Sequence, residues 1–396
     1  MIQISPETQL FIREHSSDDV RALALQAKKY PDINMPTAIT QIAGRQVAAE
    51  KIPSWREIEE IWYPKHLSLE QCSSEITARY KARLFQGDSL TDLTGGFGID
   101  CSFLATGFKS ATYVERQEEL CEIAAHNFPI LNLNHINVRN EDGVAYLQSM
   151  SPVDCIFLDP ARRNEHGGKT VAISDCEPNV AELEALLLSK ANRVMIKLSP
   201  MLDLSLALKE LKHTQEIHIL SVNNECKELL ILLGQTSPAE IAIHCVNLLT
   251  KGTQEEQHFV FTREQEQRSQ CTYTDSLGDY LYEPNASLLK AGAFRSIAAA
   301  YPVRKLHPNS HLYTSDSFIE NFPGRIFRIV NQCSFNKKEV KENLADLKKA
   351  NVTVRNFPTT VAELRKRLHL TEGGDTYLFA STLNNGQKVI IRCEKV

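Results

Sequence analysis

A glycine-rich turn at residues 92–98 constrains how the first half of this chain can fold. It runs from Asp92 through Thr94, Gly95 and Gly96 to Gly98, between a short β-type run and an apolar segment with helical spacing. Glycines between a strand and a helix let backbone N–H groups approach a ligand closely. The spacing differs from the G-x-G-x-x-G of dinucleotide folds, and the preceding acid suits a cationic or hydroxyl-bearing ligand better than a pyrophosphate. An ordinary tight turn has the same pattern, so both interpretations stay open at this point.

Acidic residues follow three further predicted strands. Glu115 follows the run 111–114, Asp142 follows the run 135–138, and Asp159 follows the run 153–158. The strict alternation of strands and helices predicts a mainly parallel sheet, in which the carboxyl ends of the strands meet at one crevice. At the end of a second strand, Glu115 is placed to accept both hydroxyls of a ribose. Asp142 is less specific, because the surrounding residues equally fit a turn followed by a helix cap.

The stretch from Asp92 to Arg163 resembles class I, Rossmann-like methyltransferases that use S-adenosylmethionine. The resemblance implies that the cofactor is bound by residues of the glycine turn and by two later acids, namely Asp92, Thr94, Gly95, Gly96, Gly98, Glu115 and Asp142. Asp159-Pro160-Ala161-Arg162 resembles the (Asp/Asn)-Pro-Pro-x catalytic motif, with alanine in the third position. That alanine keeps open the alternative of a protein that binds but no longer catalyses.

Asp159, at the end of the fourth strand, is expected to accept a hydrogen bond from an amine. This hydrogen bond aims the amine lone pair at a methyl group. Pro160 fixes the backbone direction, and Arg162 is placed in the same catalytic motif. Arg163 offers a guanidinium suited to phosphate, although a surface ion pair with nearby acids fits equally.

The end of the fifth predicted strand bears on the target atom. Related enzymes that methylate pyrimidine C5 present a cysteine after this strand. Here the place reads Lys197-Leu198-Ser199-Pro200, so the sequence favours a nitrogen target, with Lys197 and Ser199 as substrate contacts.

The whole chain also resembles bacterial methyltransferases with a C-terminal THUMP-like domain. This broader resemblance rests on residues 71–75, on Tyr80-Lys81 and on about the last seventy residues. In the resembled fold, the segment before the first strand borders the methionine end of the cofactor. Ser74, Thr77 or Lys81 is therefore a candidate to contact the cofactor carboxylate, while Ser73 equally fits a plain helix N-cap.

Four regions are predicted along the 396 residues. Residues 1–80 form a helical region that either caps the next domain or frames a substrate entrance, with one helix starting at Ser54 and passing Trp62. Residues 81–235 form the methyltransferase domain. A small α+β connecting domain follows at 236–322, with one helix from about 286 to 300. Residues 323–396 form a ferredoxin-like or THUMP-like α+β domain of order β-α-β-α-β-β, with helices at 337–350 and 360–368.

Composition excludes several classes of protein. A net charge of −5 gives no global attraction to nucleic acid, so a basic surface must be local. No apolar run approaches the roughly eighteen residues of a membrane span, and the N-terminus lacks a signal-peptide pattern. The ten cysteines form no C-x-x-C pair and read as reduced thiols of a cytoplasmic protein, not as metal ligands or disulfides.

A local basic surface is predicted in the C-terminal domain. The eleven lysines and arginines on which this prediction rests are Arg325, Arg328, Lys337, Lys338, Lys341, Lys348, Lys349, Arg355, Arg365, Lys366 and Arg367. A basic cluster beside a methyltransferase suggests an RNA-binding appendage, although interspersed acids also fit solvated helix faces. We therefore expect a methyltransferase that acts on a base nitrogen of tRNA or rRNA. A protein or small-molecule acceptor and an inactive RNA-binding protein are the alternatives; the sequence does not indicate an oligomeric state.

Overall fold

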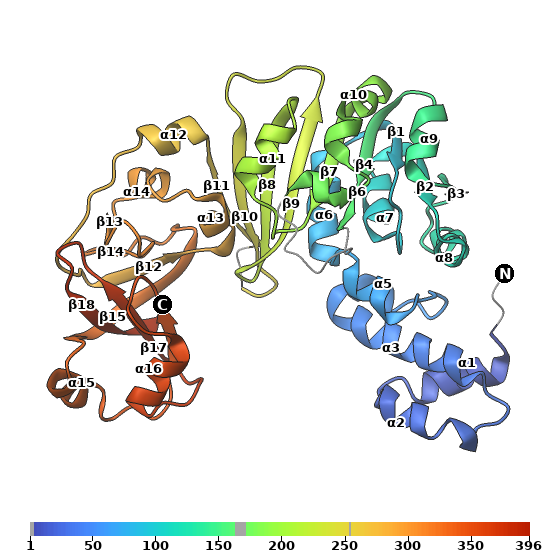
Figure 1. Cartoon of the computed structure of the whole chain (residues 1–396). Coiled ribbons are helices and arrows are strands. Elements are labelled where there is room, and N and C mark those ends of the chain that lie inside the picture. Colours follow the sequence, from blue (N-terminus) through green and yellow to red (C-terminus); the bar gives the residue numbers. More distant parts are fainter. Residues whose placement is uncertain (1–3, 163–171, 253–254) are drawn as a thin grey trace. The chain divides into compact units, whose positions relative to one another are not determined.

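The computed structural model describes residues 4–162, 172–252 and 255–396 (Figure 1). The chain divides into two compact units, one made of Met1–Gln215 with Leu230–Ser237 and the other of Glu216–Leu229 with Pro238–Val396. The division falls within two consecutive strands, β8 (Thr214–Val222) and β9 (Glu225–Gly234). The turn between them places Asn223 and Asn224 at positive φ, which asparagine tolerates better than most residues.

The N-terminal region is helical, as the sequence predicts. Its elements are α1 (Pro6–Glu14), α2 (Val20–Leu25), η1 (Ala27–Lys29), α3 (Met35–Lys51), α4 (Pro53–Arg56), α5 (His66–Gln71) and α6 (Glu75–Leu84). The side chains of Ser5, Asp19 and Asn34 cap the first three α-helices by accepting backbone N–H bonds. The helix expected from Ser54 past Trp62 is wrong in length, because α4 is a single turn. Residues 57–65 then run without regular helix to α5.

Unit 1 contains a parallel sheet in the order β7-β4-β1-β2-β3. Its strands are β1 (Gly87–Asp92), β2 (Phe108–Glu115), β3 (Ile136–Asn140), β4 (Val153–Leu158) and β7 (Ala191–Leu198). The strand β1 is central, with Asp92 in register with Phe157 on one side and Tyr113 on the other. Because all five strands are parallel, their carboxyl ends lie at one edge of the sheet.

Helices connect these strands in the alternation that the sequence predicts. They are α7 (Ile99–Ala105), α8 (Glu118–Ile130), α9 (Gly143–Ser149), α10 (Val180–Lys190) and α11 (Leu204–Glu210). A short antiparallel pair, β5 (Ala161–Arg162) with β6 (Cys176–Glu177), and the turn η2 (Ile173–Asp175) lie between β4 and α10.

The N-terminal helices pack directly on the glycine turn. One apolar cluster combines Trp55, Tyr63 and Leu69 of the helical region with Phe97 and Ile99 of the turn and α7. The Trp55 and Phe97 rings meet edge to face with centroids 5.4 Å apart. The helical region therefore holds the turn from outside, and this contact is part of the buried core.

Unit 2 contains the strands β8, β10 (Ala242–Leu248) and β11 (Glu256–Phe261), in the order β11-β10-β8. A second sheet of seven strands has the order β13-β14-β12-β15-β18-β17-β16. Its strands are β12 (Tyr280–Pro284), β13 (Arg304–Lys305), β14 (Tyr313–Ser315), β15 (Gly324–Ser334), β16 (Asn351–Val354), β17 (Thr376–Thr382) and β18 (Lys388–Lys395).

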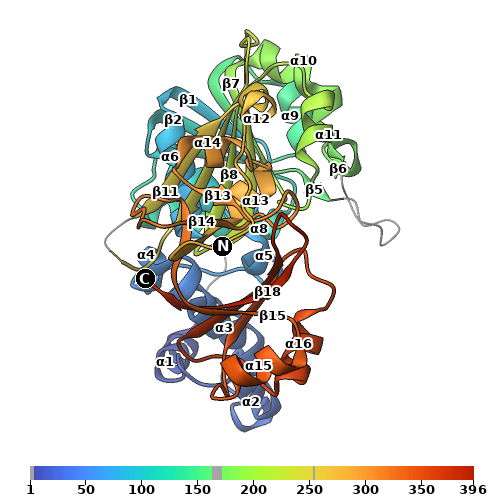
Figure 2. The ribbon, with the colours of Figure 1, turned by 90° about the vertical axis from the view of Figure 1, so that its left-hand side faces the viewer.

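The helices of unit 2 correct two predicted lengths. They are α12 (Arg263–Arg268), α13 (Ala286–Ala291), α14 (Ser296–Ala300), α15 (Lys337–Leu344) and α16 (Val361–Leu368). The single helix expected from 286 to 300 is two helices, because Gly292 adopts a left-handed conformation with φ 78° and ends the first. The helix expected to reach residue 350 ends at Leu344. Figures 1 and 2 show α15 and α16 side by side, and both pack on one apolar cluster through Leu344 and Leu364.

Across the described ranges, the structure contains no helix with the length and apolar character needed to span a membrane.

Candidate active site

The glycine turn is shaped by its contact with an aromatic ring. A Cβ atom on Gly95 would lie 2.2 Å from the Tyr113 ring, and the Tyr113 hydroxyl donates a hydrogen bond to the Gly96 carbonyl. Gly98 has φ 86° and forms the N-cap of α7. Gly95 is therefore required by close packing on β2, and Gly98 by a left-handed backbone. A ligand is not needed to explain either glycine.

Asp92, the last residue of β1, carries an unused acceptor. Asp92 is only 1% exposed, and its Oδ1 accepts a hydrogen bond of 3.0 Å from the Thr94 N–H. The other oxygen, Oδ2, is buried and has no hydrogen-bond partner among the residues that the structure describes. Burial raises the pKa of the Asp92 carboxyl well above its ordinary value, although the Thr94 N–H opposes the rise. A buried carboxylate without a partner is costly, and a cationic ligand group would reduce that cost.

Glu115, at the end of β2, binds the glycine turn. Its Oε2 accepts a hydrogen bond of 2.9 Å from the Gly96 N–H, and its Oε1 accepts one of 2.9 Å from Gln117. Each carboxylate oxygen has a second lone pair, so these bonds leave acceptor capacity for a hydroxyl-bearing ligand.

Asp142 is a helix cap in this structure. Its Oδ1 accepts hydrogen bonds of 3.0 Å from the N–H groups of Val144 and Ala145, at the start of α9. The adjacent Gly143 lies against the Leu93 carbonyl, where a Cβ would approach to 2.2 Å. The geometry therefore agrees with the helix-cap interpretation. The contact of Gly143 with Leu93 also places Asp142 next to the glycine turn.

Asp159 is fixed from two sides. Its backbone N–H donates a hydrogen bond of 2.6 Å to Thr94 Oγ1, and its Oδ2 lies 2.5 Å from the Lys197 ammonium. Thr94 therefore connects Asp159 to Asp92. About a third of the Asp159 side chain, 36%, remains exposed, and no described residue donates a hydrogen bond to its Oδ1. Burial raises the pKa of Asp159, and Lys197 is the largest influence that opposes this rise.

Register explains the pairing of Asp159 with Lys197. Leu158 of β4 lies opposite Ile196 of β7, so the next residues along these parallel strands are neighbours. Lys197 was expected to contact substrate, and this stays a prediction; in the structure its ammonium lies beside the carboxylates of Asp159 and Asp100.

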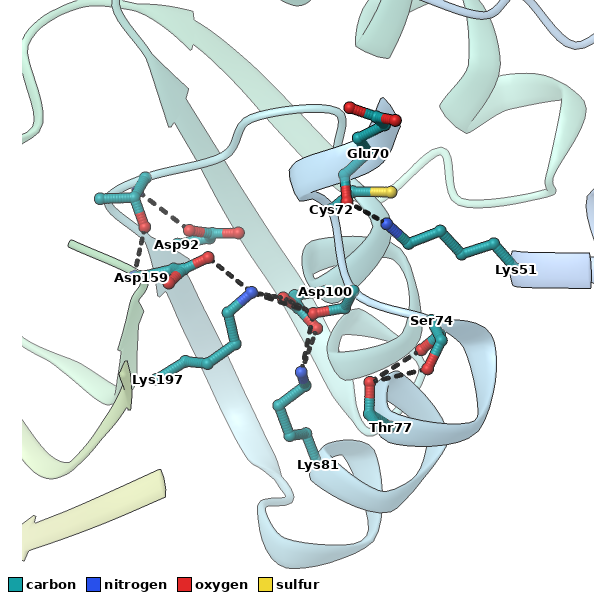
Figure 3. A network of polar contacts seen from close by, with 12 residues as sticks. Lys51, Glu70, Cys72, Ser74, Thr77, Lys81, Asp92, Asp100, Asp159 and Lys197 are labelled. Atoms are coloured by element: carbon teal, nitrogen blue, oxygen red, sulfur yellow. Dashed lines mark hydrogen bonds and ion pairs between the residues drawn. The ribbon is translucent and has the colours of Figure 1, made fainter. Parts of the chain in front are cut away.

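A buried polar network continues behind this pair (Figure 3). Asp100, in the first turn of α7, lies 3.4 Å from Lys197 and 2.8 Å from Lys81. Ser73 Oγ donates to Asp100 Oδ2 at 2.7 Å and accepts from Lys81 at 2.9 Å and from Lys197 at 3.1 Å. The Lys81 side chain is fully buried. Burial alone would raise the pKa of Asp100, but the two ammonium groups lower it to about 2.

Three residues were predicted as candidates to contact the cofactor carboxylate, and in the structure their polar groups contact other side chains. Lys81 meets Asp100 and Ser73, while Ser74 and Thr77 lie within hydrogen-bond distance of each other at 3.2 Å. Ser73 is not the N-cap of α6, because Ser74 takes that position; the Ser73 hydroxyl donates to Asp100 instead. Asp100 had no assigned role in the sequence, since it follows no strand. Only the convergence of α6, α7 and β7 makes it part of the site.

The remaining predicted residues lie apart from this network or outside the described residues. Pro160 is buried, and Ser199 accepts a hydrogen bond from the Met201 N–H in the turn after β7. The backbone of Arg162 pairs with Cys176, but the description does not extend to its side chain. Arg163 lies outside the described residues.

The C-terminal cations separate into two groups. The four arginines predicted there at positions 325, 328, 355 and 365 all form ion pairs, with Glu283, Glu394, Glu283 and Glu372 respectively. The other cations are exposed, and none is ion-paired within the described part of the chain; they are Lys337, Lys338, Lys341, Lys348, Lys349, Lys366 and Arg367. These seven, on α15, on α16 and in the loop after α15, are called the lysine surface below.

Comparison with known proteins identifies the family. The chain is similar along its whole length to the crystal structure of a candidate methyltransferase from Porphyromonas gingivalis W83, with 34% identity, a TM-score of 0.87 and 100% of both chains covered. The chain belongs to this family of class I methyltransferases with a C-terminal THUMP-like domain. Within it, residues 280–323 match the family model of a ferredoxin-like domain and residues 324–395 that of a THUMP domain-like region.

More distant structures match only part of the chain. A candidate methyltransferase from Streptococcus mutans in complex with S-adenosylhomocysteine has 12% identity and a TM-score of 0.30, over 40% of this chain and 96% of its own. M. capricolum TrmK in complex with the same product has 12% identity and a TM-score of 0.32, over 41% of this chain and 68% of its own. Such values support no argument about substrate. No curated protein matches the sequence.

Proposed function

We propose that this methyltransferase uses S-adenosylmethionine to methylate a base nitrogen in tRNA or rRNA. The observation that carries the proposal is the arrangement of Asp92 and Asp159 around Thr94. Asp92 has a buried oxygen without a partner among the described residues, and Asp159 has a side chain that is 36% exposed, with only Oδ2 held by Lys197. A cofactor group and an acceptor group can thus be held by adjacent strand ends.

The donor set fits the proposed cofactor. S-adenosylmethionine supplies an electrophilic methyl group together with a cationic amine and a ribose. Asp92 Oδ2 is the acceptor for the amine, and the free lone pairs of Glu115 are acceptors for ribose hydroxyls. The contacts of the helix-capping Asp142 with adenine, and of Gly96 and Gly98 with the ligand, follow from the family resemblance.

Asp159 is the proposed catalytic residue. Lys197 occupies its Oδ2, so Oδ1 accepts the hydrogen bond from the acceptor N–H and orients the nitrogen lone pair. Pro160 directs the chain after this acid, and Arg162 or Arg163 is the proposed anchor of the acceptor phosphate. Lys197 acts on the acceptor through Asp159, as a positioning residue. The segment Lys197-Leu198-Ser199-Pro200 after β7 contains serine and no cysteine, which favours nitrogen over pyrimidine C5 as the target.

Methyl transfer is tested with tritiated S-adenosylmethionine on RNA and, separately, on protein extract, both from cells that lack this gene. Ribonuclease-sensitive label that is lost in Asp159→Ala supports the proposal. Label in protein alone would refute the RNA assignment. Measurable cofactor binding without label in any acceptor would favour an inactive binding protein. Circular dichroism of the variant must match the wild type, since Asp159 also contributes to a buried ion network.

RNA binding is proposed to use the lysine surface. Exposed cations without acidic partners can neutralise phosphates and release counterions, with a slope of roughly 0.7–0.9 in log affinity against log salt for each contact. Changing three lysines of α15 to glutamine should weaken tRNA binding and reduce the salt slope by about two; these are Lys337, Lys338 and Lys341. The matched control changes two exposed lysines of the N-terminal region, Lys28 and Lys29. Equal effects of the two sets would refute the assignment of this surface.

A further inference from the structure

Four side chains with metal-binding chemistry gather on one face of the sheet β11-β10-β8 in unit 2. His218 of β8 is in register with His244 of the parallel strand β10. Glu216 stands two residues before His218, so its side chain projects from the same face. His258 of the antiparallel strand β11 is opposite Val246, two residues along from His244, and also shares this face.

Contacts within this group are close. The rings of His218 and His244 stack at 4.3 Å, and Glu216 Oε2 lies 3.3 Å from His218 Nε2. His244 Nδ1 lies 3.1 Å from His258 Nε2. One potential ligand atom from each of Glu216, His218 and His244 falls within 4.8 Å of the others.

We propose that Glu216, His218 and His244 bind a zinc ion, with His258 orienting His244. Imidazole and carboxylate ligands suit zinc and its transition-metal neighbours, whereas magnesium prefers oxygen ligands alone. Neutral imidazoles and one carboxylate leave a net negative charge that a divalent cation balances. A neighbouring hydrogen-bonding group that fixes the ring of a ligating histidine is usual in such sites.

Exposure is graded across the group, which gives an ion a path of entry. His218 is buried, with 3% of its side chain exposed, while 46% of the Glu216 side chain is exposed. His244 is half-buried, between these two extremes. A bound ion would connect β8 to β10 and stabilise this sheet.

The test is zinc titration by calorimetry of the full chain after removal of metal with EDTA. The expected result is one equivalent bound, with the affinity lowered at least tenfold in His244→Ala and in Glu216→Gln. The control is His66→Ala, because His66 is an exposed helical histidine with an acid, Glu70, 3.6 Å away. That variant should bind zinc as the wild type does, and magnesium should not bind at this site.

Cobalt(II) substitution distinguishes this site from the ten cysteines. A spectrum without sulfur-to-metal charge-transfer bands is expected, and a thiolate band lost on cysteine alkylation would overturn the assignment. Absence of zinc binding by the wild type, or unchanged affinity in Glu216→Gln, would also overturn it. The exposed Glu216 is the decisive position, since its change should leave the fold intact even if the His244 variant is unstable.

Discussion

Replacing Lys197 by glutamine tests how Asp159 is controlled. Lys197 places its ammonium 2.5 Å from Asp159 Oδ2 and is the largest influence that lowers the pKa of that acid against burial. A nearby opposite charge shifts a carboxyl pKa by about 1–3 units. Because 36% of the Asp159 side chain is exposed and Lys81 remains, we expect the low end of this range, a rise of about one unit.

The assay is the initial rate of methyl transfer against pH at saturating cofactor. The rate depends on ionised Asp159, so it falls as pH decreases through the Asp159 pKa, and Lys197→Gln should move this acid limb upward by about one pH unit. One unit below the wild-type midpoint, the variant should then retain about a hundredth of its own plateau rate, whereas the wild type retains about a tenth of its plateau. Lys209→Gln, on the exposed surface of α11, is the control. An acid limb that stays in place or moves downward would refute the reasoning.

Three further changes test the site by stability and binding. Asp92→Asn should leave the free energy of unfolding equal or higher, because it removes a costly buried carboxyl, but weaken S-adenosylmethionine binding by roughly 10- to 100-fold in calorimetry. The pKa of Asp100 is lowered from 3.8 to about 2, so its ionised form should add roughly 2 kcal/mol to the free energy of unfolding above pH 4, and this contribution is lost as pH falls toward 2. Urea unfolding of Asp100→Asn at neutral pH should show a free energy of unfolding lower by about 3–5 kcal/mol. Gly95→Ala forces a Cβ against the Tyr113 ring and should cost about 1–3 kcal/mol in urea unfolding, whereas Gly96→Ala meets no close atom and should cost only about 1 kcal/mol for its φ of 54°.

The parallel sheet could be predicted from the sequence because strands and helices alternate with clear polar breaks. The lengths of the helices could be predicted less well. Gly292 ends α13 through a left-handed backbone, but a glycine inside a helical pattern also fits a continuous helix, and the residues after the single turn of α4 still show helical spacing. The acids at the strand ends could also be predicted, because each comes directly after a recognisable strand. Asp100 could not, because it becomes part of the site only through Lys81 and Lys197 from other elements.

The same limit applies to the histidine group of unit 2. The cysteine spacing gave no metal motif, and the proposed ligands come from separate strands without a fixed spacing. Cross-strand register brings His218 and His244 together, and register is set by the whole sheet. Metal sites on sheet faces are therefore poorly visible in sequence even when their residue types are the usual ones.

The helical N-terminal region is more than a cap on the methyltransferase sheet. Ser73 and Lys81 contact Asp100, which contacts Lys197, which in turn holds Asp159. Two ammonium groups face two carboxylates, so Asp159 takes part in the charge balance of the buried network. Loss of its charge leaves an excess cation, and a rate lost in Asp159→Ala combines chemistry with that imbalance. Asp159→Asn keeps the shape but also removes the charge, so a comparison with Ser73→Ala, which weakens the network without touching Asp159, separates the two contributions. A slow Ser73→Ala enzyme with normal RNA and cofactor binding would place the network in control of the catalytic acid.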